Sequence, residues 1–128
     1  MKVLICGGTG FLGEAITRKL LREGNAVRVL GRSLDKIRAL FGDSVEGVQG
    51  DITKSETLPK ALEKMEAVVQ CAQFPGHPFE NRKKGSTYWQ VDGLGTENVA
   101  RLVKKAGVRH LLYISGAGVD GKKNGAVV

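Results

Sequence analysis

Short apolar runs alternate along the chain with longer segments whose apolar residues recur every three or four positions. The short runs are typical of strands that are buried on both faces of a parallel sheet. They cover residues 3–5, 26–30, 45–48, 67–71 and 108–114. The longer segments have the period of amphipathic helices. They cover residues 11–23, 34–41, a stretch from about 59, and 87–106. This alternation predicts an α/β protein.

The connections between these elements predict how the sheet is wound. Strands joined by helices pair in parallel through right-handed crossovers. A doubly wound sheet of this kind has the strand order 3-2-1-4-5, with helices on both faces. The helix ends support the boundaries, because Ser33 is placed to cap the second helix, Pro59 suits a first helical turn and Gly107 suits a C-terminal end. We expect one domain over residues 1–128.

Three glycines, Gly7, Gly10 and Gly13, follow the first predicted strand at a spacing of three. Gly7 permits a tight turn off the strand, Gly10 lets the backbone approach a pyrophosphate, and Gly13 lets the helix pack closely on the strand. The helix N-terminus then offers free N–H groups and a positive dipole end to phosphates. Because the chain has 18 glycines in 128 residues, a glycine-rich connector is the alternative interpretation.

The spacing G-x-x-G-x-x-G, together with Thr9, resembles the motif of the short-chain dehydrogenase/reductase superfamily. The resemblance is to its extended and atypical branches, which include NAD-dependent epimerase/dehydratase-like and NmrA-like proteins. It implies a Rossmann fold that binds NAD(P). Because the resemblance covers only the cofactor half of the family's fold, we expect the chain to be the N-terminal part of a longer protein.

The residues after the second strand bear on the choice of cofactor. An NAD site usually has Asp or Glu there to bind the ribose 2′-hydroxyl, and positions 30–34 contain neither. Arg32 offers a charged fork to a 2′-phosphate, Gly31 leaves space beside it, Ser33 could donate a hydrogen bond and Lys36 could add charge. These residues predict NADP as the preferred cofactor, with NAD possible; the alternative is that Arg32 is an exposed loop arginine.

Further cofactor contacts follow from the resemblance. Asp51 and Ile52 resemble the family's acidic–apolar pair at the adenine, although Gly-Asp also makes a simple turn. Cys71, Ala72 and Gln73 occupy the place where the family's fourth strand lays small residues against the cofactor, and Gln73 departs from that pattern. The residues expected at the cofactor are Gly7, Thr9, Gly10, Phe11, Leu12, Gly13, Arg32, Ser33, Asp51, Ile52, Cys71, Ala72 and Gln73.

The segment 90–98 resembles the family's Asn-Val-x-Gly-Thr-x-Asn helix, with an insertion of two and Gln90 in place of the first Asn. The resemblance implies that Asn98 supports the backbone of the active site. The alternative is a helix face whose glycines pack tightly on the sheet, and both interpretations can hold together.

The catalytic end departs from the family. Its fifth strand delivers a catalytic Ser or Thr, and a Tyr-x-x-x-Lys pair that exchanges a proton with the reacting carbonyl lies farther along. Here the hydroxyl position falls on Gly116, with Ser115 one place early, and no Tyr follows Tyr113. The catalytic residues are therefore unknown. Either the chain is truncated, which we favour, or it is an atypical member without this pair; we expect no turnover from this chain alone.

Three classes of function are compatible with these patterns. The first is the dinucleotide-binding part of a hydride-transfer oxidoreductase or a sugar-nucleotide epimerase-like enzyme. The second is a redox-inert NAD(P) sensor or assembly subunit. The third is a nucleic-acid binder, which only the net charge of +7 supports. Because the sequence has no basic strip with interleaved aromatic residues, we expect no nucleic-acid partner.

Composition also bears on compartment and partners. No apolar run reaches the length of a membrane helix, and Cys6 and Cys71 lie in apolar strands, so a cytoplasmic protein that does not bind membranes is expected. His77 and His110 do not form a metal-ligand pattern. We expect Cys6 and Cys71 to lie close together. We expect the polar segment 73–86 to be mobile at the mouth of the site. We also expect a homodimer that forms through the exposed edge of the fifth strand.

Overall fold

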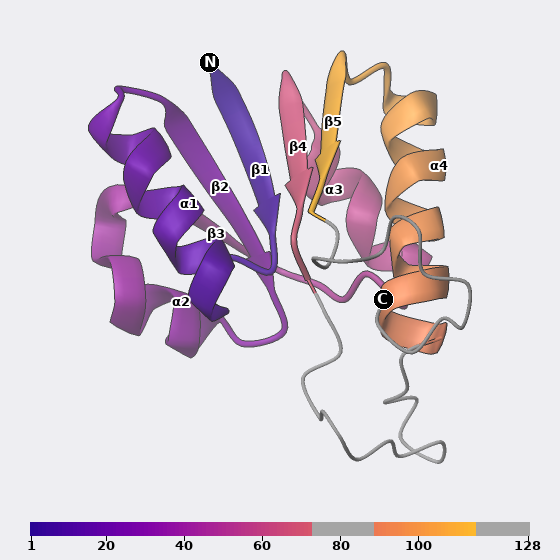
Figure 1. Cartoon of the computed structure of the whole chain (residues 1–128), viewed down its shortest axis with the longest axis horizontal. Coiled ribbons are helices and arrows are strands. Elements are labelled where there is room, and N and C mark those ends of the chain that lie inside the picture. Colours follow the sequence, from indigo (N-terminus) through magenta and orange to yellow (C-terminus); the bar gives the residue numbers. More distant parts are fainter. Residues whose placement is uncertain (73–88, 115–128) are drawn as a thin grey trace, which may run out of the picture.

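A five-stranded parallel sheet forms the centre of the computed structural model, which describes residues 1–72 and 89–114 (Figure 1). The strand order is β3-β2-β1-β4-β5, as the sequence predicts. The strands are β1 (Lys2–Cys6), β2 (Ala26–Gly31), β3 (Glu46–Gln49), β4 (Ala67–Gln70) and β5 (His110–Tyr113). In register, Cys6 lies opposite Leu30 of β2 and Gln70 of β4, so the carboxyl ends of the three central strands meet at one edge.

Helices cover both faces of the sheet, which confirms the doubly wound architecture. Figure 1 shows α1 (Phe11–Arg22) and α2 (Leu34–Phe41) grouped on one side, and α3 (Leu58–Leu62) and α4 (Thr96–Ala106) on the other. Short 3-10 helices lie at Gly42–Ser44 and Ser55–Thr57, and a π-helix, η4 (Trp89–Gly95), precedes α4.

The alternation of strand residues divides the core into two clusters, one on each face. Leu4 and Cys6 point to the cluster beneath α3 and α4, whereas Val3 and Ile5 point to the cluster beneath α1 and α2. The central strands are therefore apolar on both sides, as the continuous apolar runs predict.

Most element boundaries agree with the predicted ones to within one residue, and two elements differ by more. The predicted helix 87–106 is α-helical only from Thr96, because the glycines at 93 and 95 weaken the α-helix and the backbone there takes the wider π form. The predicted strand 108–114 begins at His110, since Gly107 adopts a left-handed C-cap and the Val108 amide donates to the Val103 carbonyl at 3.2 Å.

Arg28 of β2 ties the sheet to α3, a role that the sequence analysis did not predict. Its side chain is only 12% exposed. Nη1 donates to the carbonyls of Ala61 and Glu63 at 2.7 and 2.9 Å, which satisfies the end of α3, and Nη2 lies 3.2 Å from a carboxylate oxygen of Glu46. A charged side chain can be buried here because it is both paired and hydrogen-bonded.

Candidate functional site

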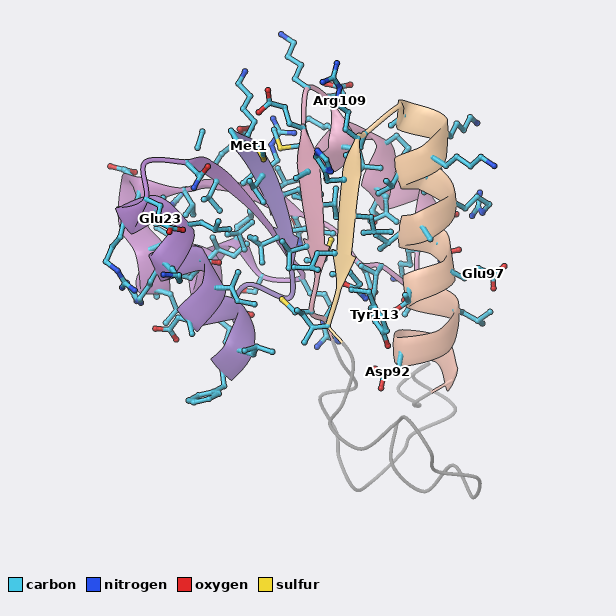
Figure 2. All side chains as sticks on the ribbon, turned by 45° about the horizontal axis from the view of Figure 1, so that its top comes forward. Met1, Glu23, Asp92, Glu97, Arg109 and Tyr113 are labelled. Carbon is cyan, nitrogen blue, oxygen red and sulfur yellow. The ribbon has the colours of Figure 1, made fainter. Side chains whose placement is uncertain are left out.

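The predicted cofactor residues that the structure describes lie at the carboxyl edge of the sheet, where β1, β2, β3 and β4 end. In Figure 2, Tyr113 and Asp92 lie at this edge, while Met1 and Arg109 mark the opposite one. Ligands of open α/β sheets bind outside the carboxyl ends of the strands, where the strand order reverses. Here β1 is that point, because the chain winds from it toward β3 on one side and β5 on the other.

Two of the three motif glycines are required by the packing of the chain itself. Gly7 has a φ of +87°, and a Cβ there would lie 2.5 Å from the Ala72 nitrogen at the exit of β4. A Cβ on Gly13 would overlap the carbonyl oxygen of Gly7. Gly7 therefore permits both the turn and the close approach of β4, and Gly13 permits α1 to start against the loop.

Gly10 differs from the other two, because none of the residues that the structure describes requires a glycine there. Its φ of −78° suits any residue. The nearest atom to a Cβ would be the Gly7 carbonyl oxygen, at an ordinary contact distance of 3.5 Å. Gly10 is exposed and is the N-cap of α1, which has no side-chain cap. The open position therefore faces outward in front of uncapped helix amides, a geometry that suits an anion close to the backbone.

Thr9, Phe11 and Leu12 contribute little side-chain packing to the core. Thr9 is half-buried, Leu12 is exposed, and Phe11 is 95% exposed. The fully buried positions of α1 are Gly13 and Thr17. These residues lie just before and at the start of α1, where the sequence predicts the pyrophosphate, and the Phe11 side chain is exposed to solvent.

The exit of β2 presents an exposed cation. The Arg32 side chain is exposed and has no ion pair among residues 1–72 and 89–114, while its carbonyl accepts a hydrogen bond from Gln49 Nε2 at 3.3 Å. Ser33 Oγ accepts from the Lys36 amide at 3.2 Å and so caps α2 as predicted. Because it accepts there, its hydroxyl proton remains available to a ligand.

Asp51 and Ile52 follow β3 in a tight turn. Asp51 Oδ1 accepts from the Thr53 amide at 2.9 Å and from the Thr53 hydroxyl at 2.7 Å. Thr57 Oγ1 accepts from the Asp51 amide at 3.0 Å. Ile52 is buried in the core beneath α3 and α4. The structure therefore shows the turn that the alternative interpretation describes, with the Ile52 side chain in the core and the Asp51 side chain half-buried.

Side chains in the first turn of α4 form hydrogen bonds with residues at or just after the carboxyl ends of β3 and β4. Asn98 Nδ2 donates to the Ile52 carbonyl at 2.8 Å, so this amide supports the backbone after β3. Thr96 Oγ1 accepts from Nε2 of Gln70 at 3.1 Å. Gln70 is fully buried, and sequence reasoning missed it. The one available signal was a polar amide at the end of an otherwise apolar strand.

Cys6 at the end of β1 and Cys71 directly after β4 lie close together, as predicted. The Cys71 amide and Sγ both donate to the Cys6 carbonyl, at 2.9 and 3.1 Å. Both cysteines are free, and their side chains belong to the core clusters on opposite faces of the sheet. Burial, and secondarily the neighbouring Cys71, raises the pKa of Cys6 to about 12, and burial raises the pKa of Cys71 to about 11. Neither thiol is a nucleophile at neutral pH.

Several predicted features lie outside the described residues. These are Gln73, the segment 73–86, Ser115 and Gly116. Within residues 1–72 and 89–114, no group of His, Cys, Asp and Glu could hold a metal ion. In the same part of the chain, no helix is long and apolar enough to cross a membrane.

Comparisons with known proteins agree with this geometry. Residues 3–127 match the model of the NAD dependent epimerase/dehydratase family. The chain is 37% identical over 115 residues to photosystem II assembly factor Ycf39 of Synechocystis, which covers 90% of this chain and 33% of that protein. It is 35% identical over 115 residues to bovine sterol-4-alpha-carboxylate 3-dehydrogenase, decarboxylating, which covers 90% of this chain and 30% of that protein.

A solved structure shares the fold. The Thermus thermophilus UDP-glucose 4-epimerase complex with NAD has a TM-score of 0.76 and 26% identity, over 90% of this chain and 37% of that one. The chain thus spans about a third of the length of the curated relatives that it matches.

Proposed function

Because the chain belongs to the NAD dependent epimerase/dehydratase family, we propose that it is the dinucleotide-binding part of a hydride-transfer oxidoreductase or a sugar-nucleotide epimerase-like enzyme. The observation that carries the proposal is Gly10, which the chain's own packing does not require and which leaves space before the uncapped N-terminus of α1. A pyrophosphate needs both free amides and close access to the backbone.

The described residues divide the dinucleotide between two sides of β1. The glycine loop and the start of α1 would bind the pyrophosphate through backbone amides. Arg32 and Ser33, with the backbone at Asp51 and Ile52, would bind the adenosine end, while Cys71 and Ala72 after β4 would border the nicotinamide end. The cofactor supplies the hydride chemistry, and these residues bind and orient it.

Within this proposal, NADP is the preferred cofactor and NAD binds more weakly. The exposed Arg32 guanidinium has no ion pair among residues 1–72 and 89–114, and positions 30–34 carry no carboxylate that would repel a 2′-phosphate. Arginine binds phosphate through two parallel hydrogen bonds, and the Ser33 hydroxyl offers a third donor beside it.

A second candidate function uses the same site without catalysis. One relative, at 37% identity, is a photosystem II assembly factor. A redox-inert NAD(P)-binding sensor or assembly subunit would need the same glycine loop and no proton-transfer pair. Dinucleotide binding without turnover in the longest natural form of the protein would favour this function over the first.

Titration of NADPH and NADH at fixed ionic strength tests the cofactor proposal. Arg32→Ala should weaken NADPH by about tenfold to a hundredfold, since each charge-assisted hydrogen bond contributes about 1.5–3 kcal/mol and the exposed site loses part of that. NADH should change much less. Arg22→Ala removes an exposed arginine from the last turn of α1 and serves as the control. Equal losses for both cofactors would show that Arg32 does not recognise the 2′-phosphate.

Compartment and assembly complete the proposal. The two free, buried cysteines suit the reducing cytoplasm. Among the described residues β5 is an edge strand with Leu111, Leu112 and Tyr113 exposed, and we propose that it pairs with a second copy of this chain. Light scattering should then give the mass of a dimer, and Leu112→Lys should give the mass of a monomer. A wild-type monomer at every concentration would reject this assembly.

A further inference from the structure

The buried amide of Gln70 binds both peptide groups of the residue two positions later. Oε1 accepts from the Ala72 amide at 3.2 Å, and Nε2 donates to the Ala72 carbonyl at 3.3 Å. Nε2 also donates to Thr96 Oγ1 at 3.1 Å. A buried amide is costly unless its hydrogen bonds are made. Here both ends of the amide are used, and they fix the chain just after β4.

Ala72 is held at the point where it touches the glycine loop. A Cβ on Gly7 would lie 2.5 Å from the Ala72 nitrogen and 2.6 Å from its Cα, so the two backbones are in close contact. The Cys71 amide continues the sheet by donating to the Cys6 carbonyl at 2.9 Å. The position of Ala72 therefore bounds the space available to Gly7 and to the loop that begins there.

We propose that Gln70 is a positioning residue of the dinucleotide site. It fixes Ala72 against Gly7 and links both to the start of α4 through Thr96, so that the loop 7–13 has its binding shape before the ligand arrives. Pre-organisation of this kind improves affinity because less ordering is needed on binding. Gln70 itself is fully buried and does not reach the ligand. The inference rests on the proposed dinucleotide binding.

Gln70→Met tests this role in the full chain, because methionine has a similar length and makes no such hydrogen bonds. Three quantities are measured: the exchange rate of the Ala72 amide proton in the unliganded protein, the affinity for NADPH, and the affinity for adenosine 2′-monophosphate. The last ligand engages the Arg32 side of the site and lacks the pyrophosphate. It therefore separates a local effect on the loop from a general loss of structure.

We expect the Ala72 amide of Gln70→Met to exchange at least about tenfold faster and NADPH to bind about tenfold more weakly. Adenosine 2′-monophosphate should bind as it does to wild type. Asn25→Leu is the control, because it removes a partly buried side-chain amide bond to the Leu20 carbonyl (3.1 Å), in the turn before β2 at the opposite edge of the sheet. That control should leave all three quantities unchanged.

Two variants at Thr96 give a second, milder test in case Gln70→Met folds poorly. Thr96→Val removes one hydrogen bond and should weaken NADPH binding by a few fold. Thr96→Ser keeps the hydroxyl and should bind NADPH with wild-type affinity. Unchanged NADPH affinity despite faster Ala72 exchange would overturn the proposal, as would equal losses for both ligands. Failure of wild type to bind any dinucleotide would instead reject the proposed function, and the positioning role with it.

Discussion

The first two helices of the chain begin at the same edge of the sheet, and their first turns differ. α2 begins at Ser33, whose hydroxyl accepts the Lys36 amide at 3.2 Å. α1 begins at Gly10, which has no side chain and leaves the first amides without a side-chain cap. Both helices carry a carboxylate in the first turn, Glu14 in α1 and Asp35 in α2. The difference therefore lies in the cap and not in the charge.

This difference separates a helix end built for stability from one that suits a ligand. A Ser cap stabilises a helix by about 1 kcal/mol relative to a residue that cannot cap. Gly10 could be replaced by such a residue without a clash, so the chain forgoes a cap that its own geometry would accept. Departures from the locally best residue are expected at functional sites, and the uncapped end of α1 is the proposed pyrophosphate site.

The largest expected effect comes from Gly13→Ala, because a Cβ there overlaps the Gly7 carbonyl oxygen. Either the loop or α1 must move, so we expect the free energy of unfolding to fall by about 4 kcal/mol or more. Urea denaturation followed by circular dichroism measures it. Gly10→Ala is the matched control and should change stability by less than about 1 kcal/mol. Equal unfolding midpoints for the two variants would contradict the described packing.

Gly10→Asp should make α1 resemble α2 and remove the ligand site. The carboxylate would cap the helix, which changes stability by only a few tenths of a kcal/mol relative to Gly. It would also fill the open position with negative charge, so both NADPH and NADH should bind about a hundredfold more weakly, equivalent to about 2.8 kcal/mol. Calorimetric titration measures the loss. Retained affinity would show that the pyrophosphate binds elsewhere.

Ser33→Ala gives the smallest effect and tests the other side of the comparison. Losing the cap of α2 should lower the free energy of unfolding by about 1 kcal/mol, without a change in the denaturant slope. NADPH should weaken by only a few fold, since Arg32 remains. Ser44→Ala, at an exposed serine in the 3-10 helix after α2, should change neither quantity. If the two serine variants behave alike, Ser33 does not cap α2 in solution.

Sequence patterns predicted the elements that depend on local chemistry. The apolar runs gave the five strands and their order, and Ser33 marked the start of α2 correctly. The π form of η4 was missed, because the apolar period does not distinguish it from the start of an α-helix. At the glycine loop, the spacing predicted the roles of Gly7 and Gly13 correctly, while the open space at Gly10 is seen only in the three-dimensional structure.

The buried polar side chains could not be predicted in the same way. Arg28 Nη1 and Gln70 Nε2 donate to partners far away in the sequence, at Ala61 and Thr96. A polar residue within an apolar strand gives no indication of which distant carbonyl or hydroxyl will meet it, because that depends on how the helices pack. Polar groups of this kind become visible only when the tertiary structure is known.

The two cysteines can report when the helices separate from either face of the sheet. One thiol lies in the core on each face of the sheet, and burial keeps both protonated, with pKa values of about 12 and 11. We therefore expect a thiol reagent at neutral pH to react slowly with both cysteines in the closed structure, and faster when a face separates from its helices. Mass spectrometry of the labelled chain would time the release of α3 and α4 at Cys6 and that of α1 and α2 at Cys71, without any engineered label.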